Sequence, residues 1–220
     1  MNASVSVYSR SAALAVPVNK VLRNTYTMLT LMLGLSALTA FIAINNNFGM
    51  PNVWLLLAFM IGMPIAIHAT RNNVFGLLLS FAYAAMFGLF LGPVIGVYLR
   101  IDPKIPLYAF TATSVVFFSL TLYAMTTKRD MSFMGGFLMV GSVVILLAIV
   151  ANIFLQMPMM SLVISGAVVM LTAGYILYTT QAMVRGGEDN YILLATSLFA
   201  DIWVMFLHLM RLFAYFQGED

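Results

Sequence analysis

Seven long apolar stretches, separated by short polar breaks, organise this chain. They are Tyr26–Asn45, Val53–Ala69, Val74–Tyr98, Leu107–Met125, Phe133–Phe154, Ser161–Tyr178 and Tyr191–Phe213. The hydrocarbon core of a bilayer is about 30 Å thick and needs about 17–25 mainly apolar residues per helix, and every stretch has such a length. The pattern therefore predicts an all-α integral membrane protein with seven transmembrane helices. Pro64 interrupts the second stretch, where we expect a kink.

The breaks between these stretches are too short to hold a separate domain. Pro, Asn and charged side chains gather in them, as is typical of turns. They cover residues 46–52, 70–73, 99–106, 126–132, 155–160 and 179–190. We therefore predict one seven-helix transmembrane domain over residues 25–215, between a flexible cytoplasmic N-terminal tail of residues 1–24 and a short non-cytoplasmic tail of residues 216–220.

The N-terminal tail differs from the rest of the chain because Ser and Ala dominate its first part. Residues 1–17 have the composition of a disordered segment. The tail lacks the charged-then-apolar pattern of a cleaved signal peptide, so the first span is expected to remain as a permanent anchor.

Composition and charge agree with the membrane class. Apolar residues make up 63% of the chain and charged residues only 8%, against about 25% charged in soluble domains. The net charge is +3, but the basic residues lie beside helix ends and form no stripe with aromatic residues, so we expect no nucleic-acid binding. The absence of Cys excludes disulfides and thiolate-bound metals.

Lys and Arg are divided unevenly between the two sides of the predicted bundle. With the N-terminus in the cytoplasm, the cytoplasmic side holds Arg10, Lys20, Arg23, Arg71, Lys128, Arg129 and Arg185, and the other side holds Arg100, Lys104 and Arg211. Since an excess of Lys and Arg marks cytoplasmic loops, we expect a cytoplasmic N-terminus and a non-cytoplasmic C-terminus.

Asp201 is the most informative polar residue, because it lies about eleven residues into the last span. At 1.5 Å per residue it is about 16 Å deep, near the middle of the bilayer. A carboxylate there costs roughly 2.5 to 3.5 kcal/mol, so it should face the bundle interior and have a partner or hold a proton. Asp201 is a candidate ion or proton site. The alternative is a structural acid that fastens helices through hydroxyl or amide partners.

His208 and Arg211 follow Asp201 on one broad face of the predicted helix. At 100° per residue they lie about 20° and about 80° from the direction of Asp201. One interpretation is a chain of ionisable groups from the midplane to the non-cytoplasmic surface. The other is an interfacial histidine and an arginine that reaches the headgroups, which is the interpretation we favour for Arg211.

Gly88 and Gly92, followed at once by Pro93, form a small-residue motif in the third span. Two glycines four residues apart leave a groove into which a neighbouring helix can pack closely. The motif therefore predicts close helix packing, with a hinge as the alternative.

No motif of catalysis or cofactor binding is present. The sequence lacks an H-E-x-x-H zinc motif, a P-loop and a dinucleotide fingerprint, and His68 and His208 are about 140 positions apart. Only one aspartate is deep in a span, so a membrane aspartic protease with two such acids is not indicated. We expect no enzyme activity, no cofactor and no resident metal.

Several segments resemble one known family. They are Lys20–Tyr26 (KVLRNTY), Gly88–Pro93, Thr127–Gly136 (TKRDMSFMGG), Gly186–Ile192 (GGEDNYI) and the helix with Asp201. By these motifs the chain is similar to the Bax inhibitor-1 family, and within it to the bacterial YccA branch, from Asn19 to Phe213. The resemblance implies a bundle in which six helices surround a central last helix.

The resemblance implies two activities of different kinds. Members of the YccA branch are inner-membrane partners of the membrane-anchored AAA protease FtsH, on which they act as inhibitors and slow substrates. Other members of the family are pH-sensitive calcium leak channels, for which calcium is the transported species. For this chain we favour modulation of FtsH in a bacterial inner membrane, with the calcium leak as the alternative.

The channel mechanism of the family depends on a pair of acids, one on the sixth helix and one on the seventh. Asp201 matches the seventh-helix acid, whereas the sixth-helix motif reads Tyr178-Thr179-Thr180-Gln181, with Thr179 in place of the acid. A carboxyl group beside a hydroxyl cannot share a proton as two carboxyl groups do, so this replacement weakens the pH-sensing mechanism.

Overall fold

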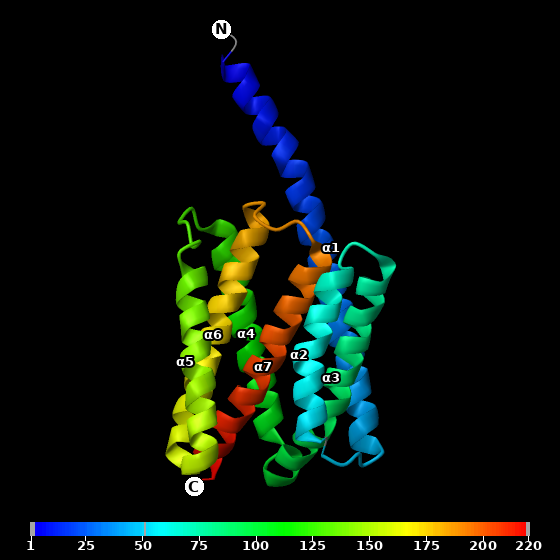
Figure 1. Ribbon diagram of the computed structural model, residues 1–220, viewed down its shortest axis with the longest axis vertical. Coiled ribbons are helices and arrows are strands. Elements are labelled where there is room, and N and C mark those ends of the chain that lie inside the picture. Colours follow the sequence, from blue (N-terminus) through cyan, green and yellow to red (C-terminus); the bar gives the residue numbers. More distant parts are fainter. Residues whose placement is uncertain (1–2, 51, 219–220) are drawn as a thin grey trace.

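The computed structural model describes residues 3–50 and 52–218, and in these ranges the chain forms seven α-helices and no strand (Figure 1). The helices are α1 (Ala3–Asn45), α2 (Val53–Thr70), α3 (Val74–Ile101), α4 (Lys104–Thr126), α5 (Met134–Leu155), α6 (Pro158–Val184) and α7 (Tyr191–Gln217). Six of them are long and apolar enough to cross a membrane. The all-α membrane class predicted from the sequence is confirmed.

The helix that differs from the other six is α2, with 18 residues and Pro64 inside it. At 1.5 Å per residue it is about 27 Å long, slightly less than the hydrocarbon thickness. Asn52 caps its first turn by accepting a hydrogen bond from the Trp54 backbone N–H at 2.9 Å. The predicted second span is therefore present as a short apolar helix.

The predicted helix ends differ most from the observed ones at two breaks. α6 continues to Val184, so Thr179–Gln181 are helical although the sequence places them in a loop. Thr180 and Gln181 are buried, and tertiary contacts extend the helix through these polar residues. The break between α3 and α4 shrinks to two residues, because Asp102 accepts the backbone N–H of Lys104 at 2.8 Å and starts the next helix.

α1 extends beyond the bundle, and Figure 1 shows its N-terminal part standing clear of the other helices. The sequence predicts a flexible tail over residues 1–24, whereas the structure continues the helix from Asn45 back to Ala3. The flexibility of this segment stays a prediction. Residues 1, 2, 219 and 220 lie outside the described ranges. We call the side of the bundle from which α1 projects its N-terminal end, and the opposite side its C-terminal end.

α7 is the central helix, but five helices surround it where the family resemblance implies six. α7 contacts α1, α2, α3, α4 and α6, whereas α5 packs on α6 alone. Half of the most apolar part of α7 is buried, while Leu138 is the only fully buried residue among those described on α5. α5 therefore presents most of its surface to the outside of the bundle.

Aromatic side chains fill the space between α7 and the helices α2 and α3. Phe87 and Phe199 are fully buried, and the Phe87 ring contacts the rings of Trp203 and Tyr83 at centroid distances of 4.4 and 4.3 Å. The indole N–H of Trp203 donates to the backbone carbonyl of Phe87 at 3.3 Å. This cluster fixes α7 against α3 at Phe199 and Trp203, each two residues from Asp201.

α1 and α3 approach each other most closely at Gly88 and Gly92. A Cβ at Gly88 would collide with the Thr39 hydroxyl and the Ser36 carbonyl, and a Cβ at Gly92 would lie 2.5 Å from the Ala43 Cβ and 2.7 Å from the Ala40 carbonyl. We call this contact the α1–α3 seam. Pro93 follows inside the unbroken α3, so the structure places the motif in close packing, and a hinge there stays a prediction.

Replacing Gly88 by Ala should lower the melting temperature of the purified protein in detergent. The added methyl group meets backbone, which cannot move aside cheaply, and overpacking of this kind costs about 1–3 kcal/mol. Gly34→Ala is the matched control, since nothing lies within 4 Å of a Cβ at that position on α1. Equal melting temperatures for the two variants would contradict close packing of α1 and α3 at the seam.

Candidate functional site

Asp201 lies on α7 about 15 Å from the first residue of the helix, in the middle of the bundle. Its Oδ2 atom is buried and has no hydrogen-bond partner in the described part of the chain. The hydroxyl of Tyr83 on α3 is an electrostatic neighbour of this carboxyl group. Asp201 therefore does not fasten helices by a hydrogen bond through Oδ2, and the group is available to hold a proton or attract a cation.

Other polar contacts hold α7 to α3 on either side of Asp201. The hydroxyl of Thr196 donates to the Ser80 hydroxyl at 3.0 Å, and Ser80 in turn donates to the carbonyl of Gly76 at 2.8 Å. Together with the bond from Trp203 to α3, these contacts bracket the acid. The position of Asp201 is thus set by its neighbours, and its own oxygens are not needed for it.

Thr179 is half-buried on α6, and no hydrogen bond joins it to Asp201 within the described residues. Asp201 is ten residues from the start of α7, whereas Thr179 is five residues from the end of the antiparallel α6. Counted along the helices, the acid is about twice as deep as the threonine. A role of Thr179 in ion or proton passage stays a prediction.

Three buried hydroxyl groups lie together between helices, and we call them the hydroxyl cluster: Tyr26 on α1, Thr121 on α4 and Thr180 on α6. Their spacing in the sequence does not indicate such a group. The hydroxyl of Tyr26 lies next to those of Thr121 and Thr180. None of the three reaches good hydrogen-bond geometry with a protein group. Buried polar groups normally have partners, so the hydroxyl cluster is an unusual group of unpaired polar atoms between helices.

His208 and Arg211 lie further along α7, toward the C-terminal end of the bundle. The Nδ1 atom of His208 is buried without a hydrogen-bond partner, and the exposed Arg211 acts electrostatically on both His208 and Tyr98. His208 thus lies near a positive charge. A continuous proton chain through His208 stays a prediction.

The hydroxyl cluster, Asp201 and His208 provide polar atoms at three levels of the bundle. No hydrogen bond connects one level to the next among the described residues. In the same part of the chain, no three side chains of His, Asp or Glu lie close enough together to hold a metal ion. The arrangement can hold a proton or a transient cation at Asp201, and it provides no built metal centre.

The loop between α4 and α5 is fastened to the end of α6, which accounts for the Thr127–Gly136 motif. The buried Gln181 side chain accepts the backbone N–H of Met131 at 2.7 Å and donates to the Arg129 carbonyl at 2.6 Å. The guanidinium of Arg185 donates to the carbonyl of Lys128 at 2.8 Å and to that of Arg129. Arg185 also lies 3.8 Å from the Asp130 carboxylate.

Asp130 is exposed, and its pKa is lowered mainly by the hydrogen bond from the Ser132 side chain, then by the Ser132 backbone N–H, with a smaller effect of Arg185. Because the pKa of Asp130 is lowered, its ionised carboxylate stabilises this turn at neutral pH. That stabilisation is lost as the pH falls through the pKa that Asp130 has in the folded state.

A second fastening joins the start of α7 to the loop between α2 and α3. The Asn190 side chain accepts the backbone N–H groups of Ile192 and Leu193, and its amide donates to the Arg71 carbonyl at 3.1 Å and to Asn72 at 3.3 Å. Gly186 ends α6 with φ at 72°, a conformation in which a side chain is strained. The Gly186–Ile192 motif therefore contains the C-terminal end of α6 and the N-terminal cap of α7.

The fold and these sites define a multi-pass helical membrane protein with an acid on its apolar central helix and loops fastened at one end. A family model described as "Inhibitor of apoptosis-promoting Bax1" matches residues 18–218. The chain therefore belongs to the Bax inhibitor-1 family, as its motifs predict.

Bacterial relatives match nearly the whole chain. An uncharacterized protein of Pseudomonas aeruginosa is 37% identical over 205 residues, which cover 92% of each chain. A protein of Escherichia coli K12 named "Modulator of FtsH protease YccA" is 38% identical over 198 residues, which cover 90% of each chain. Its counterpart in E. coli O6:H1, equally similar, is named "Inner membrane protein YccA".

Variants at the two fastenings should free different loops. In Gln181→Leu the Met131 amide loses its acceptor, so its hydrogen exchange should accelerate by about fivefold or more. In Asn190→Ala the accelerated amides should instead be those of Ile192 and Leu193. Exchange measured by mass spectrometry on both proteins provides the comparison, each variant serving as the control for the other. The same pattern in both variants would contradict two separate fastenings.

Proposed function

We propose that this protein is an inner-membrane modulator of FtsH, acting as a slow substrate and inhibitor of that protease, and not as an enzyme. The similarity to the E. coli protein named as a modulator of FtsH carries the proposal, because it covers 90% of both chains. The name "Inner membrane protein" of the second E. coli relative supports the location. The excess of Lys and Arg on the side of the bundle that holds the N-terminus supports a cytoplasmic N-terminus.

The shape of α1 supports this function in physical terms. A protease that pulls a substrate needs an accessible end, and the N-terminal part of α1 projects from the bundle (Figure 1). The same helix then enters the α1–α3 seam, where glycine brings two backbones into contact. Extraction of α1 would have to break that packing in one step, which is a barrier suited to a substrate that is degraded slowly.

Co-purification with FtsH tests the proposal directly. The tagged full-length protein is solubilised from bacterial membranes in mild detergent, and FtsH is measured in the eluate. A tagged multi-pass membrane protein of similar size is the control. FtsH should be enriched with this protein, and recovery equal to the control would overturn the proposal.

Removal of residues 2–19 should lengthen the half-life of the protein in cells with active FtsH, because the protease loses the segment that it grips. The bundle should keep its melting temperature, since the seam begins further along α1. Removal of Glu219 and Asp220 is the control at the other end of the chain. An unchanged half-life after the N-terminal deletion would exclude this segment as the grip.

A second candidate function, a pH-dependent calcium leak, is favoured by one observation: Asp201 is half-buried in mid-bundle, and its buried Oδ2 atom has no hydrogen-bond partner in the described part of the chain. In a membrane interior such an acid is a default functional site. The unpartnered hydroxyls of the hydroxyl cluster provide a polar environment on the N-terminal side of the acid.

Calcium flux into vesicles that contain the purified protein tests this candidate between pH 5 and 8. Asp201→Asn keeps the size of the side chain but cannot titrate, so the pH dependence of the flux should flatten. Thr179→Asp adds a second acid near the end of α6, which should sharpen the pH dependence if the two groups interact. Negligible, identical flux from the native protein and both variants would exclude the leak.

A further inference from the structure

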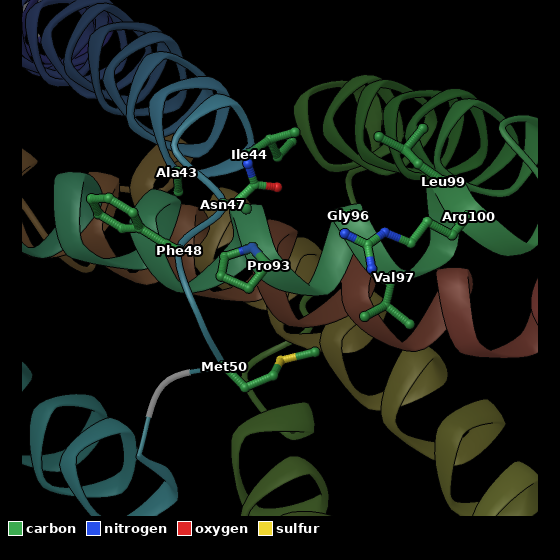
Figure 2. Close-up of a pocket in the computed structure, with 11 residues that line it drawn as sticks. Ala43, Ile44, Asn47, Phe48, Met50, Pro93, Gly96, Val97, Leu99 and Arg100 are labelled. Carbon is green, nitrogen blue, oxygen red and sulfur yellow. The ribbon is translucent and has the colours of Figure 1, made fainter.

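A pocket of about 360 Å³ opens at the C-terminal end of the bundle, between the end of α1 and the last turns of α3 (Figure 2). Asn47, Phe48 and Met50, which follow α1, form one wall, and Gly92, Gly96 and Arg100 on α3 form the other. The pocket borders the α1–α3 seam at Gly92 and is apart from Asp201, the hydroxyl cluster and the two loop fastenings.

The local structure explains why the space stays open. Asn47 has φ at 50°, and the backbone N–H groups of Phe48 and Asn47 bond to the carbonyls of Ala43 and Ile44, a helix end that folds the chain back on itself. After this turn, Phe48 and Met50 line the pocket. On the facing helix, a Cβ at Gly96 would meet nothing within 4 Å, so no side chain fills the groove.

Arg100 gives this mostly apolar pocket a positive charge. Figure 2 shows its side chain extending back along α3 toward Gly96, across the opening of the pocket. Within the described residues Arg100 forms no ion pair, since the only pair found there joins Arg185 to Asp130. An arginine at the end of a span normally turns outward to the headgroups, whereas this one lies over an apolar groove.

We propose that this pocket binds an anionic phospholipid from the leaflet at the C-terminal end of the bundle, with its phosphate on Arg100 and part of an acyl chain in the groove beside Gly96. Arginine binds phosphate through paired, charge-assisted hydrogen bonds. The exposed side chains around the opening, such as Phe48, Met50 and Val97, are apolar and face the region of the acyl chains. A free phosphate ion would gain nothing from this lining.

Charge selects an anionic lipid over a zwitterionic one. The headgroup of a zwitterionic phospholipid carries its own cation, which competes with Arg100 for the phosphate and repels the guanidinium. A phosphatidylglycerol headgroup has no such cation. Asn47 borders the same pocket and presents an amide that can donate to a phosphate or glycerol oxygen.

Native mass spectrometry in neutral detergent tests the site, with dioleoylphosphatidylglycerol as the probe and dioleoylphosphatidylcholine as the comparison. The native protein should retain one tightly bound phosphatidylglycerol and release phosphatidylcholine at the same concentration. Arg100→Gln should weaken the binding of phosphatidylglycerol by about tenfold, because it removes the charge-assisted bonds.

Arg100→Gln also lowers the net positive charge of the protein, so a second variant tests the groove without a change of charge. Gly96→Leu fills the groove without changing charge, and the open space at Gly96 lets the variant fold, so it should also weaken binding. Arg211→Gln removes an exposed arginine outside the pocket and should leave binding unchanged. Equal binding of the two lipids, full binding by Gly96→Leu, or equal losses in the two arginine variants would overturn the proposal.

Discussion

The presence of a half-buried acid near the middle of a membrane span is the constraint on which this structure depends. The carboxyl group of Asp201 cannot face lipid without a large cost, so α7 must be surrounded by protein. Five helices provide that cover, and α5 is left outside, packed on α6. The central position of α7 is therefore required by one residue, and the aromatic packing around Phe87 and the closeness of α1 to α3 make it geometrically possible.

Association of helices in lipid gains little from the hydrophobic effect, so it depends on close packing and on polar contacts. Both occur here, at different places. The α1–α3 seam relies on small residues and contains no side-chain hydrogen bond between the two helices in the described ranges. α7 is instead fixed by hydroxyl and indole bonds to α3 and by the Asn190 cap. α7, which carries Asp201, is thus held by polar contacts. α1, whose N-terminal end is accessible, is held by close packing.

The spans and the packing role of the glycines were predictable, because they depend on local composition and spacing. The length of α6 was not, since Thr180 and Gln181 look like loop residues until the partner of Gln181, a loop fifty residues earlier in the chain, is known. The hydroxyl cluster was not predictable for the same reason. Tyr26, Thr121 and Thr180 are each ordinary in a membrane helix, and only the fold brings them together. Two of the motifs that carry the family resemblance lie in the fastened loops, but the hydrogen bonds that fasten them depend on residues far apart in the chain.

The two ends of α1 bear on the proposed function in opposite ways. At the N-terminal end the helix projects and offers a protease a place to pull. At the C-terminal end it stops in a tight turn whose residues border the pocket over Arg100. A force applied at the projecting end is transmitted along the helix to the α1–α3 seam and then to this turn. A lipid bound there would hold Phe48 and Met50 against α3, and its release would be one of the last steps of extraction. The rate at which α1 leaves the bundle would then depend on the lipid composition of the leaflet farthest from the protease.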